Sequence, residues 1–368
     1  MTKFKIPISK PNLTEGDFLE IKKCFNTSWI SSKSPWVAKF EKSFAKNISK
    51  TKYAVAVNSG TSAIFLALKA LGIGAGDEVI IPALTMIATV NAVSWAGAKP
   101  VLIDSTSTLD WNINPDKIEE KITNKTKAII PVHLYGYSCD MKKINIVAKK
   151  HKLFVIEDAA EAMGASFQNK RVGSLGDISC FSLYSNKIIT TGNGGMVATN
   201  DEKIYDLLKK LEFFDFNEKN HFKHDLIGYN LVLSGLQASL GYSQVKRFDK
   251  LLAKRRLIFA WYRKNLVNKN LKFIKPLSDD NPNYWFPALI AKDFNIKTRI
   301  LTKLKNENIE TREFFLPINM QPVYKEIFAG QDYPISEYFF KTGILLPSYY
   351  DLTLDNVKHI CNLISDRS

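Results

Sequence analysis

The sequence has few cysteines, no long hydrophobic run and no segment typical of a secreted protein. Its four cysteines are scattered along 368 residues, so they predict neither a disulfide framework nor a Cys-x-x-Cys metal site. No apolar run approaches the roughly 20 residues that a membrane-spanning helix requires. The start of the chain also lacks the apolar core of a signal peptide. We therefore expect a cytoplasmic protein in a reducing environment, with no metal ion and no membrane attachment.

Arginine is also scarce, which bears on the meaning of the basic charge. Of the 51 basic residues, eight are Arg and 43 are Lys, against 36 acidic residues, for a net charge of +15. Such a charge admits nucleic acids, membranes and small anions as partners. Nucleic-acid-binding proteins rely on Arg and gather basic residues on one face, whereas Lys is spread here over the whole chain. We therefore expect no nucleic-acid partner. The densest basic run has the spacing of a solvated helix face (Lys246, Arg247, Lys250, Lys254, Arg255, Arg256, Arg263 and Lys264).

From residue 53 onward, short β-rich runs alternate with helical patterns. A first helix is expected to begin after the N-cap Thr14 and to end near Phe25. The regular alternation predicts a mostly parallel sheet with helices on both faces. Apolar runs such as Val79–Ile81 suit strands that are buried on both faces. The predicted strands are 54–57, 78–81, 99–103, 128–132, 153–157, 178–182 and 195–199, and the predicted helices between the first five are 61–71, 88–96, 115–122 and 141–151.

The pattern changes near residue 215. The polar and aromatic segment 215–225 predicts a loop, and a long basic helix is expected to follow it as far as residue 266. Beyond it we expect a strand at 284–290 and helices at 297–306 and 355–364. We predict an α/β fold with two domains: a three-layer large domain (1–245) and a smaller α+β C-terminal domain (246–368).

Polar residues follow three of the predicted strands, at the sheet edge where such folds bind ligands. Asn58–Thr61 open a helix whose backbone N–H groups can meet an anion, although a simple N-cap explains the same residues. Neither a P-loop nor a dinucleotide fingerprint is present there. Asp158 follows the strand at 153–157. Lys187 lies between the strand end at Ser182 and a Gly-rich turn, where a lysine can form a Schiff base, although one lysine among 43 would by itself indicate a surface residue. Together, an anion cradle, an acid and a lysine match the phosphate, pyridine nitrogen and aldehyde of pyridoxal 5′-phosphate (PLP).

Many further segments, in order and over roughly 300 residues, resemble the DegT-type nucleotide-sugar aminotransferases, which have the aspartate-aminotransferase fold. Within that family the similarity is greatest to the GDP-perosamine synthases, which are 4-aminotransferases. The segments that carry it include Trp29–Ser32, Ser59–Thr61, Gly76–Ile80, Pro131–Gly136, Ile156–Glu161, Gly173–Asp177, Asn186–Gly192, Gly228–Asn230, Gln321–Tyr324 and Leu346–Ser348.

The resemblance implies an activity and roles for the two polar residues above. The activity is the transfer of an amino group from L-glutamate to a nucleotide-linked 4-keto-6-deoxy sugar, which provides an amino sugar for a surface polysaccharide such as the lipopolysaccharide O-antigen. Lys187 would bind PLP covalently and, once released, carry the proton in the transfer. Asp158 would pair with the pyridinium nitrogen, an interaction that favours the charged forms of both groups.

The resemblance also implies which residues bind the rest of the cofactor. The backbone of Gly60 and Thr61 and the hydroxyl of Ser182 would hold the phosphate. Glu161 would lie beside the ring hydroxyl and Met86 against the ring face. Asn230 would reach the phosphate of a neighbouring subunit, so a homodimer with shared active sites is implied.

Five positions differ from the usual family pattern. Met86 replaces an aromatic residue and contacts a ring less rigidly. Leu231 and Val232 replace a Tyr-Arg pair, which removes a cation expected near a phosphate. Asn319 replaces a His, and Asn193 replaces a Glu. Because Lys187 and Asp158 are unchanged, the reaction class is unaffected, and the differences bear on the substrate.

Three alternatives remain open. The first is a 3-aminotransferase that acts on a dTDP- or UDP-linked 3-keto sugar. The second is a PLP-dependent sugar dehydratase, which Lys187 argues against because that branch of the family has His at this position. The third is a non-catalytic binding protein on the same scaffold.

Overall fold

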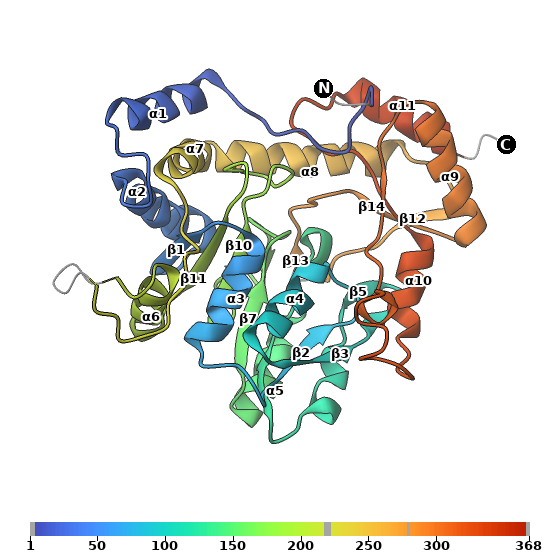
Figure 1. Cartoon of the computed structure of the whole chain (residues 1–368). Coiled ribbons are helices and arrows are strands. Elements are labelled where there is room, and N and C mark those ends of the chain that lie inside the picture. Colours follow the sequence, from blue (N-terminus) through green and yellow to red (C-terminus); the bar gives the residue numbers. More distant parts are fainter. Residues whose placement is uncertain (1–3, 217–221, 278–279, 366–368) are drawn as a thin grey trace.

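The computed structural model describes residues 4–216, 222–277 and 280–365. Its centre is a seven-stranded sheet with the strand order β1-β11-β10-β7-β6-β2-β3 (Figure 1). Strand β11 pairs antiparallel with both of its neighbours, and the other neighbouring strands pair in parallel. The prediction of a mostly parallel sheet is therefore confirmed. The strands are β1 (Tyr53–Val57), β2 (Glu78–Pro82), β3 (Lys99–Ile103), β6 (Thr126–Ile129), β7 (Phe154–Asp158), β10 (Ile178–Ser182) and β11 (Gly195–Thr199).

Helices cover both faces of this sheet, as the side chains of β1 illustrate. Successive side chains of a strand point to opposite faces. Val55 and Val57 belong to the hydrophobic cluster under α3 (Gly60–Ala70), α4 (Ile87–Ala96) and α6 (Glu202–Glu212). Ala54 and Ala56 belong to the cluster on the opposite face. That face is covered by α2 (Pro35–Phe44), α5 (Met141–His151) and α7 (Gly235–Val245).

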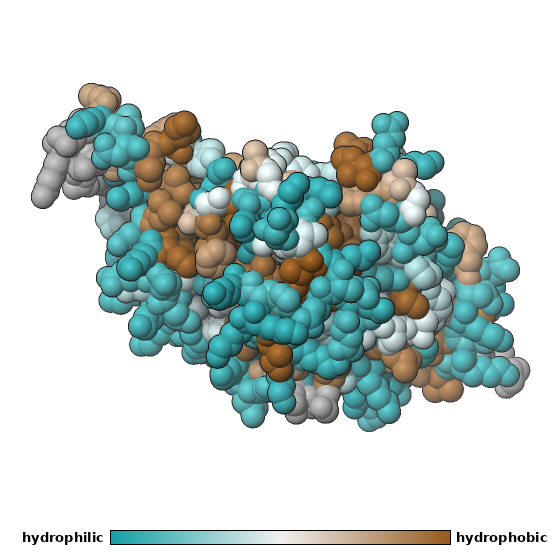
Figure 2. Space-filling view, turned by 90° about the horizontal axis from the view of Figure 1, so that it is seen from below, coloured by the Kyte–Doolittle hydropathy of each residue, from teal (hydrophilic) through white to brown (hydrophobic). Residues whose placement is uncertain are grey.

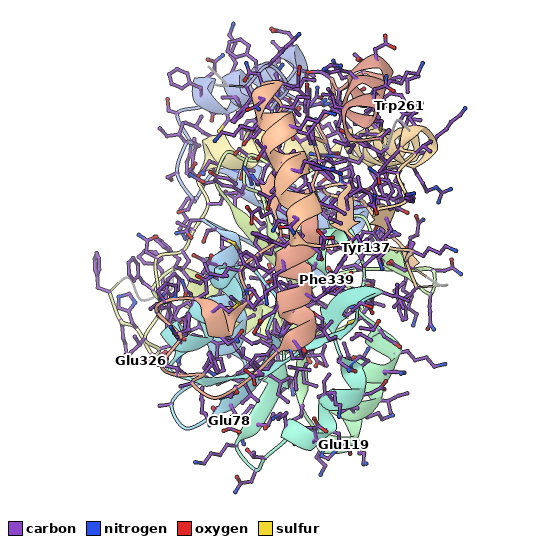
Figure 3. The ribbon with its side chains drawn as sticks, turned by 90° about the vertical axis from the view of Figure 1, so that its right-hand side faces the viewer. Glu78, Glu119, Tyr137, Trp261, Glu326 and Phe339 are labelled. Carbon is purple, nitrogen blue, oxygen red and sulfur yellow. The ribbon has the colours of Figure 1, made fainter. Side chains whose placement is uncertain are left out.

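A smaller antiparallel sheet lies in the C-terminal part, with the order β12-β14-β16-β15. One side of this sheet packs in a hydrophobic cluster in which Trp111 contacts both Tyr137 and Phe339 edge-on, at ring-centroid distances of 4.7 and 5.9 Å. In Figure 3, Tyr137 and Phe339 lie near the middle of the molecule. The elements are β12 (Leu271–Phe273), β14 (Ala288–Ala291), β15 (Arg312–Glu313), β16 (Gly343–Leu345), α8 (Phe248–Asn265), α9 (Phe294–Asn306), α10 (Pro334–Thr342) and α11 (Leu354–Ile364).

The N-terminal segment contacts both parts of the molecule. The predicted first helix is present as α1 (Glu15–Asn26), with Thr14 as its N-cap. Ahead of it, Ile6 pairs with Ile309 and packs in the hydrophobic cluster of the C-terminal part. The division of the chain at residue 246 stays a prediction. The remaining elements are short: β4 (Ser105–Ser107), β5 (Asp110–Ile113), β8 (Ser166–Phe167), β9 (Lys170–Arg171), β13 (Asp280–Asn281) and brief π- and 3₁₀-helical turns, among them Ala45–Ser49, Leu134–Gly136 and Ile318–Met320.

Three of the expected elements differ from the observed ones. The long helix expected to end near residue 266 is divided at Lys246 and Arg247 into α7 and α8. Residues 115–122 form two 3₁₀ turns, Pro115–Lys117 and Glu119–Lys121, instead of an α-helix. Eight residues are too few for a helix to be stable without extensive packing, and only Pro115 and Ile118 of this segment are buried. The strand expected at 284–290 begins only at Ala288, because Tyr284 has a positive φ of 51° and Pro287 has no N–H to donate to a ladder.

The surface is mainly hydrophilic on the side seen in Figure 2, with separate hydrophobic patches. No helix within the described residues is long and apolar enough to cross a membrane. Of the predicted loop 215–225, residues 217–221 lie outside the described residues. On its described part, the carboxylate of Asp215 accepts hydrogen bonds from the backbone N–H groups of Asp225 and Leu226.

Candidate active site

The carboxyl ends of β1, β7 and β10 open into one pocket of about 1150 Å³, a volume that includes its open mouth. Polar residues that are far apart in the sequence meet there because these strand ends share one edge of the sheet. The pocket brings together seven of the eight residues predicted for the site: Gly60, Thr61, Met86, Asp158, Glu161, Ser182 and Lys187. The eighth, Asn230, is exposed and lies outside the lining.

The N-terminus of α3 and the end of β10 form one wall of the pocket. Ser59 caps the helix by accepting the backbone N–H of Ser62 at 3.0 Å. Gly60 lies so close to β10 that a Cβ atom on it would be 3.0 Å from Cβ of Ser182. Glycine at this position therefore lets the first backbone N–H groups of the helix and the Ser182 hydroxyl face the same space. Such an arrangement can bind an anion.

Asp158 ends β7 and is buried, with 4% of its surface exposed. Its Oδ2 accepts a hydrogen bond from Thr89 Oγ1 at 2.8 Å, and its Oδ1 accepts one from the backbone N–H of Ala160 at 3.1 Å. Burial raises the pKa of Asp158 above its ordinary value, while Thr89, Ala160, Lys187 and His133 oppose the rise. Within the described residues Asp158 forms no ion pair. A cation that entered the pocket would therefore gain by contact with this carboxylate.

Glu161 follows in the next turn and is also buried. Its Oε2 accepts the backbone N–H of Tyr135 at 2.8 Å. Burial raises the pKa of Glu161 to about 7, and the nearby charge of Asp158 adds to this, against the opposing effect of Lys187. At neutral pH the Glu161 carboxyl can therefore donate or accept a proton.

Lys187 lies on the loop after β10, and its Nζ is 3.8 Å from the ring centroid of Trp285. Burial lowers the pKa of Lys187 to about 8, while the carboxylates of Glu161 and Asp158 oppose that change. The guanidinium groups of Arg312 and Arg255 lower it further. A substantial fraction of this amine is therefore neutral, and nucleophilic, close to physiological pH.

Four residues of the site were not found from the sequence: Thr89, Trp285, Arg312 and Phe315. Nothing in the sequence indicated Thr89, because it lies within an apolar helix. The other three lie in the C-terminal part of the chain, far in sequence from the strands that line the pocket. The scarcity of Arg was one available signal for Arg312, which lines the pocket and forms no ion pair with a described residue.

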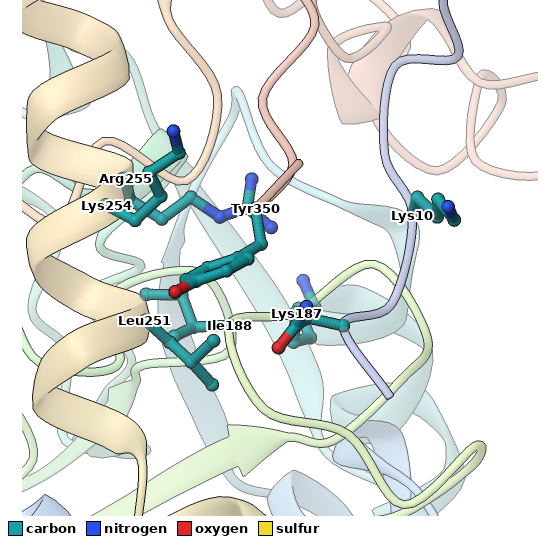
Figure 4. Close-up of a pocket in the computed structure, with 8 residues that line it drawn as sticks. Lys10, Lys187, Ile188, Leu251, Lys254, Arg255 and Tyr350 are labelled. Carbon is teal, nitrogen blue, oxygen red and sulfur yellow. The ribbon is translucent and has the colours of Figure 1, made fainter. Parts of the chain in front are cut away.

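A second, smaller cavity lies on another side of Lys187, between α8 and the N-terminal segment (Figure 4). Arg255 lines it and is 6% exposed, so the prediction that the whole basic run of α8 is a solvated face is wrong for this residue. Arg255 is buried because its Nη1 donates hydrogen bonds to the carbonyl oxygens of Trp285 and Ser348. Arg247 also differs from the predicted solvated face, since it forms an ion pair with the buried Asp17 at 2.7 Å.

The residues that differ from the family pattern lie in different places. Met86 and Asn193 line the pocket. Leu231 accepts the backbone N–H of Asn58 at 2.7 Å, beside the end of β1. Asn319 lies in a 3₁₀ turn, and its side-chain oxygen has no hydrogen-bond partner among the described residues. Of these differences, only those at Met86 and Asn193 act directly on the pocket lining of this chain.

The residues present fit PLP. The pocket combines an N–H-lined wall with a serine hydroxyl for a phosphate, a buried acid with no ion-pair partner among the described residues for a protonated pyridine, and a lysine with a lowered pKa for an aldehyde. These groups lie in one cavity, and each matches a different functional group of the cofactor.

Comparisons with known proteins lead to the same chemistry. The model of the DegT/DnrJ/EryC1/StrS aminotransferase family matches residues 11–365. The GDP-perosamine synthase of Escherichia coli O157:H7 is 41% identical over 361 residues, which cover 98% of each chain. Two of the solved structures that cover 98% of this chain illustrate the similarity. One is Helicobacter pylori PseC, an aminotransferase involved in the biosynthesis of pseudoaminic acid (28% identity, 98% of its chain, TM-score 0.91). The other is the PLP form of Spr1654 from Streptococcus pneumoniae, described as a sugar aminotransferase (25% identity, 97% of its chain, TM-score 0.92). The chain therefore belongs to the DegT/DnrJ/EryC1/StrS family and is a PLP-dependent sugar aminotransferase.

Proposed function

We propose that the enzyme transfers an amino group from L-glutamate to the 4-keto carbon of a nucleotide-linked 4-keto-6-deoxy sugar, as a GDP-perosamine synthase does. The observation that carries the proposal is the meeting of Lys187, Asp158 and the α3 N-terminus in one pocket, in a chain 41% identical to a GDP-perosamine synthase over almost its whole length. The product would be an amino sugar for a surface polysaccharide.

The proposed roles follow from the surroundings of each residue. When bound, PLP supplies an electron-withdrawing ring that stabilises negative charge on the carbon that loses a proton. Asp158, which is buried and hydrogen-bonded by Thr89, would hold the proton on the ring nitrogen. The N–H groups of Gly60 and Thr61 and the Ser182 hydroxyl would hold the phosphate. Glu161 would lie beside the ring hydroxyl, and Met86, with 47% of its surface exposed, would cover the ring face at the mouth of the pocket.

Lys187 is the proposed proton carrier. Its lowered pKa makes the released amine a base near neutral pH, so that it can accept a proton from the α-carbon of the donor and deliver it to a neighbouring carbon. Arg312 provides a guanidinium at the pocket for the anionic groups of the substrates, which are the carboxylates of glutamate and the diphosphate of the sugar nucleotide.

We also propose that the enzyme is a cytoplasmic homodimer in which Asn230 of one subunit contributes to the phosphate site of the other. Asn230 is exposed and outside the pocket of its own subunit. Large apolar side chains are exposed on α1 and on the segment before Asn230, including Phe18 (56%), Phe25 (64%), Phe222 (92%) and Ile227 (90%). Such surfaces often mark protein interfaces. The free, buried state of Cys24, Cys139, Cys180 and Cys361 suits a reducing compartment.

The test is a panel of nucleotide sugars with a 4-keto or a 3-keto group, each incubated with glutamate and analysed by the mass of the product. We expect amination of the GDP-linked 4-keto-6-deoxy sugar, and no product with the Lys187→Ala variant. Lys150→Ala, which changes an exposed lysine of α5, is the matched control and should keep full activity.

Other outcomes of the panel favour the alternatives. Amination of a dTDP- or UDP-linked 3-keto sugar alone would replace the proposed substrate, and loss of a hydroxyl without amination would indicate a dehydratase. Full transaminase activity in the Lys187→Ala variant would refute the assignment of Lys187.

A further inference from the structure

Trp285 is the aromatic residue against which the amine of Lys187 lies. The Nζ atom is 3.8 Å from the centroid of the ring, a distance at which an ammonium group is attracted to the ring face. Trp285 has 4% of its surface exposed and lines the same pocket as Lys187. Because water is largely excluded from this contact, the attraction is stronger than it is at an exposed site.

Trp285 is held in place by one hydrogen bond at its ring and another at its backbone. Its Nε1–H donates a hydrogen bond to the carbonyl oxygen of Asn186 at 2.9 Å, and Asn186 directly precedes the lysine that the ring faces. The carbonyl oxygen of Trp285 accepts a hydrogen bond from Arg255 Nη1 at 2.9 Å. Trp285 thus connects the lysine loop to helix α8, because its indole N–H bonds to the loop and its backbone carbonyl bonds to Arg255. The face of the ring lies against Nζ.

The other charged groups around Lys187 oppose one another. Glu161 and Asp158 favour the ammonium form, whereas Arg312, Arg255 and burial favour the neutral amine. The result is a pKa of about 8, so both forms of the amine are populated near neutral pH. Because these effects nearly balance, a contact made only by the ammonium form of Lys187 measurably shifts the equilibrium between amine and ammonium toward the ammonium.

We propose that Trp285 is a positioning residue that binds the ammonium form of Lys187 through its ring face when the lysine is not bound to PLP. The inference rests on the proposed function, in which the released lysine accepts a proton at one carbon and donates it at another. Between these two transfers the amine is an ammonium. The ring face stabilises this form and keeps Nζ beside the pocket.

The experiment measures the rate at which PLP rebinds to the apoenzyme as a function of pH. Formation of the absorbance band at ~400–430 nm requires the neutral amine, so the midpoint of the pH profile reports the pKa of Lys187. Trp285→Leu keeps an apolar side chain but removes the ring face, and we expect the midpoint to fall by about one pH unit, equivalent to about 1.4 kcal/mol. Trp285→Phe keeps a ring face without the N–H donor and should shift the midpoint by less than half as much.

A second measurement does not depend on the folding of the Leu variant. Fluorinated tryptophan keeps the shape of the indole but weakens the attraction of its face for a cation, so wild-type enzyme produced with it should also have a lower midpoint. The matched control is Trp285→Phe enzyme produced in the same way, in which the other five tryptophans are fluorinated and no further shift is expected.

The outcomes separate the two proposals. An unchanged midpoint in the fluorinated wild-type enzyme, or an equal shift in the fluorinated Trp285→Phe enzyme, would overturn the role of Trp285. A wild-type protein that forms no absorbance band with PLP at any pH would contradict the proposed function itself.

Discussion

At the scale of single residues, the chemistry of this site depends on how burial and neighbouring groups change each ionisable side chain. Asp158 and Glu161 are both buried, and burial raises the pKa of each. They differ in their partners: Asp158 accepts a side-chain hydroxyl from Thr89, whereas Glu161 accepts a backbone N–H from Tyr135. Thr89 therefore favours the ionised form of Asp158, which is the form that can pair with a protonated pyridine.

Replacing Thr89 tests this relation. Thr89→Val keeps the shape of the side chain but removes the hydrogen bond to Asp158, which raises the pKa of Asp158 further and weakens its pairing with the cofactor. A hydrogen bond to a charged group contributes about 1.5–3 kcal/mol, so we expect PLP to bind at least about tenfold more weakly in a spectrophotometric titration. Thr342→Val is the matched control, because Thr342 is also buried and hydrogen-bonded but lies in α10. Equal PLP affinity in both variants would contradict the role of Thr89.

At the scale of elements, a buried charge cluster connects α2, α6 and β1 beneath the segment that carries Asn230. Glu41 of α2 accepts the backbone N–H of Ala56 at 2.9 Å, and Lys209 of α6 forms ion pairs with both Glu41 and Glu212. Burial raises the pKa of Glu212 to about 7. The backbone carbonyl of Glu212 also accepts the N–H of Leu231 at 2.9 Å, so the cluster supports the chain directly after Asn230.

The cluster predicts a pH dependence of stability. The pKa of Glu212 is higher in the folded protein than its unfolded value of about 4.5, so its contribution is fully present below pH 4.5 and is lost as the pH rises through about 7. The Glu212→Gln variant has no carboxyl group to ionise at this position, so it does not lose this stability as the pH rises. We therefore expect the free energy of unfolding of the variant, relative to wild type, to increase by about 2 kcal/mol between pH 5 and pH 8.

Denaturant unfolding at the two pH values measures this difference. Glu202→Gln, at an exposed position of the same helix, serves as the control and should show no such change. A relative stability of Glu212→Gln that is the same at both pH values would show that Glu212 is ionised to the same extent in the folded and unfolded chains.

At the scale of the whole molecule, the pocket is assembled from both parts of the chain. The part built around the large sheet contributes Gly60, Asp158 and Lys187, and the C-terminal part contributes Trp285 and Arg312. In the proposed homodimer Asn230 adds a contribution from a second subunit. A two-fold symmetric dimer would then contain two sites, each with residues from both chains.

Mixing two inactive or impaired variants tests the sharing of the sites. In a heterodimer of Lys187→Ala and Asn230→Ala subunits, one of the two sites would have both native residues if Asn230 acts across the interface. After the subunits of an equal mixture are exchanged, about a quarter of the wild-type activity should return, because about half of the dimers are mixed and each has one intact site. No gain above the average of the separate variants would show that Asn230 acts within its own subunit or not at all.

The sequence by itself was sufficient to predict the three-layer α/β fold and the meeting of Asp158, Ser182 and Lys187. The reason is physical: regular alternation of strands and helices produces a parallel sheet, and the carboxyl ends of parallel strands share one edge. Only the tertiary structure decided that β1 lies next to β11 and places Gly60 against Ser182. Only the tertiary structure likewise showed that Trp285 faces Lys187 and that Arg255 is buried. These contacts join segments far apart in the chain, and their partners are chosen by packing between the two sheets, which leaves no periodic pattern in the sequence.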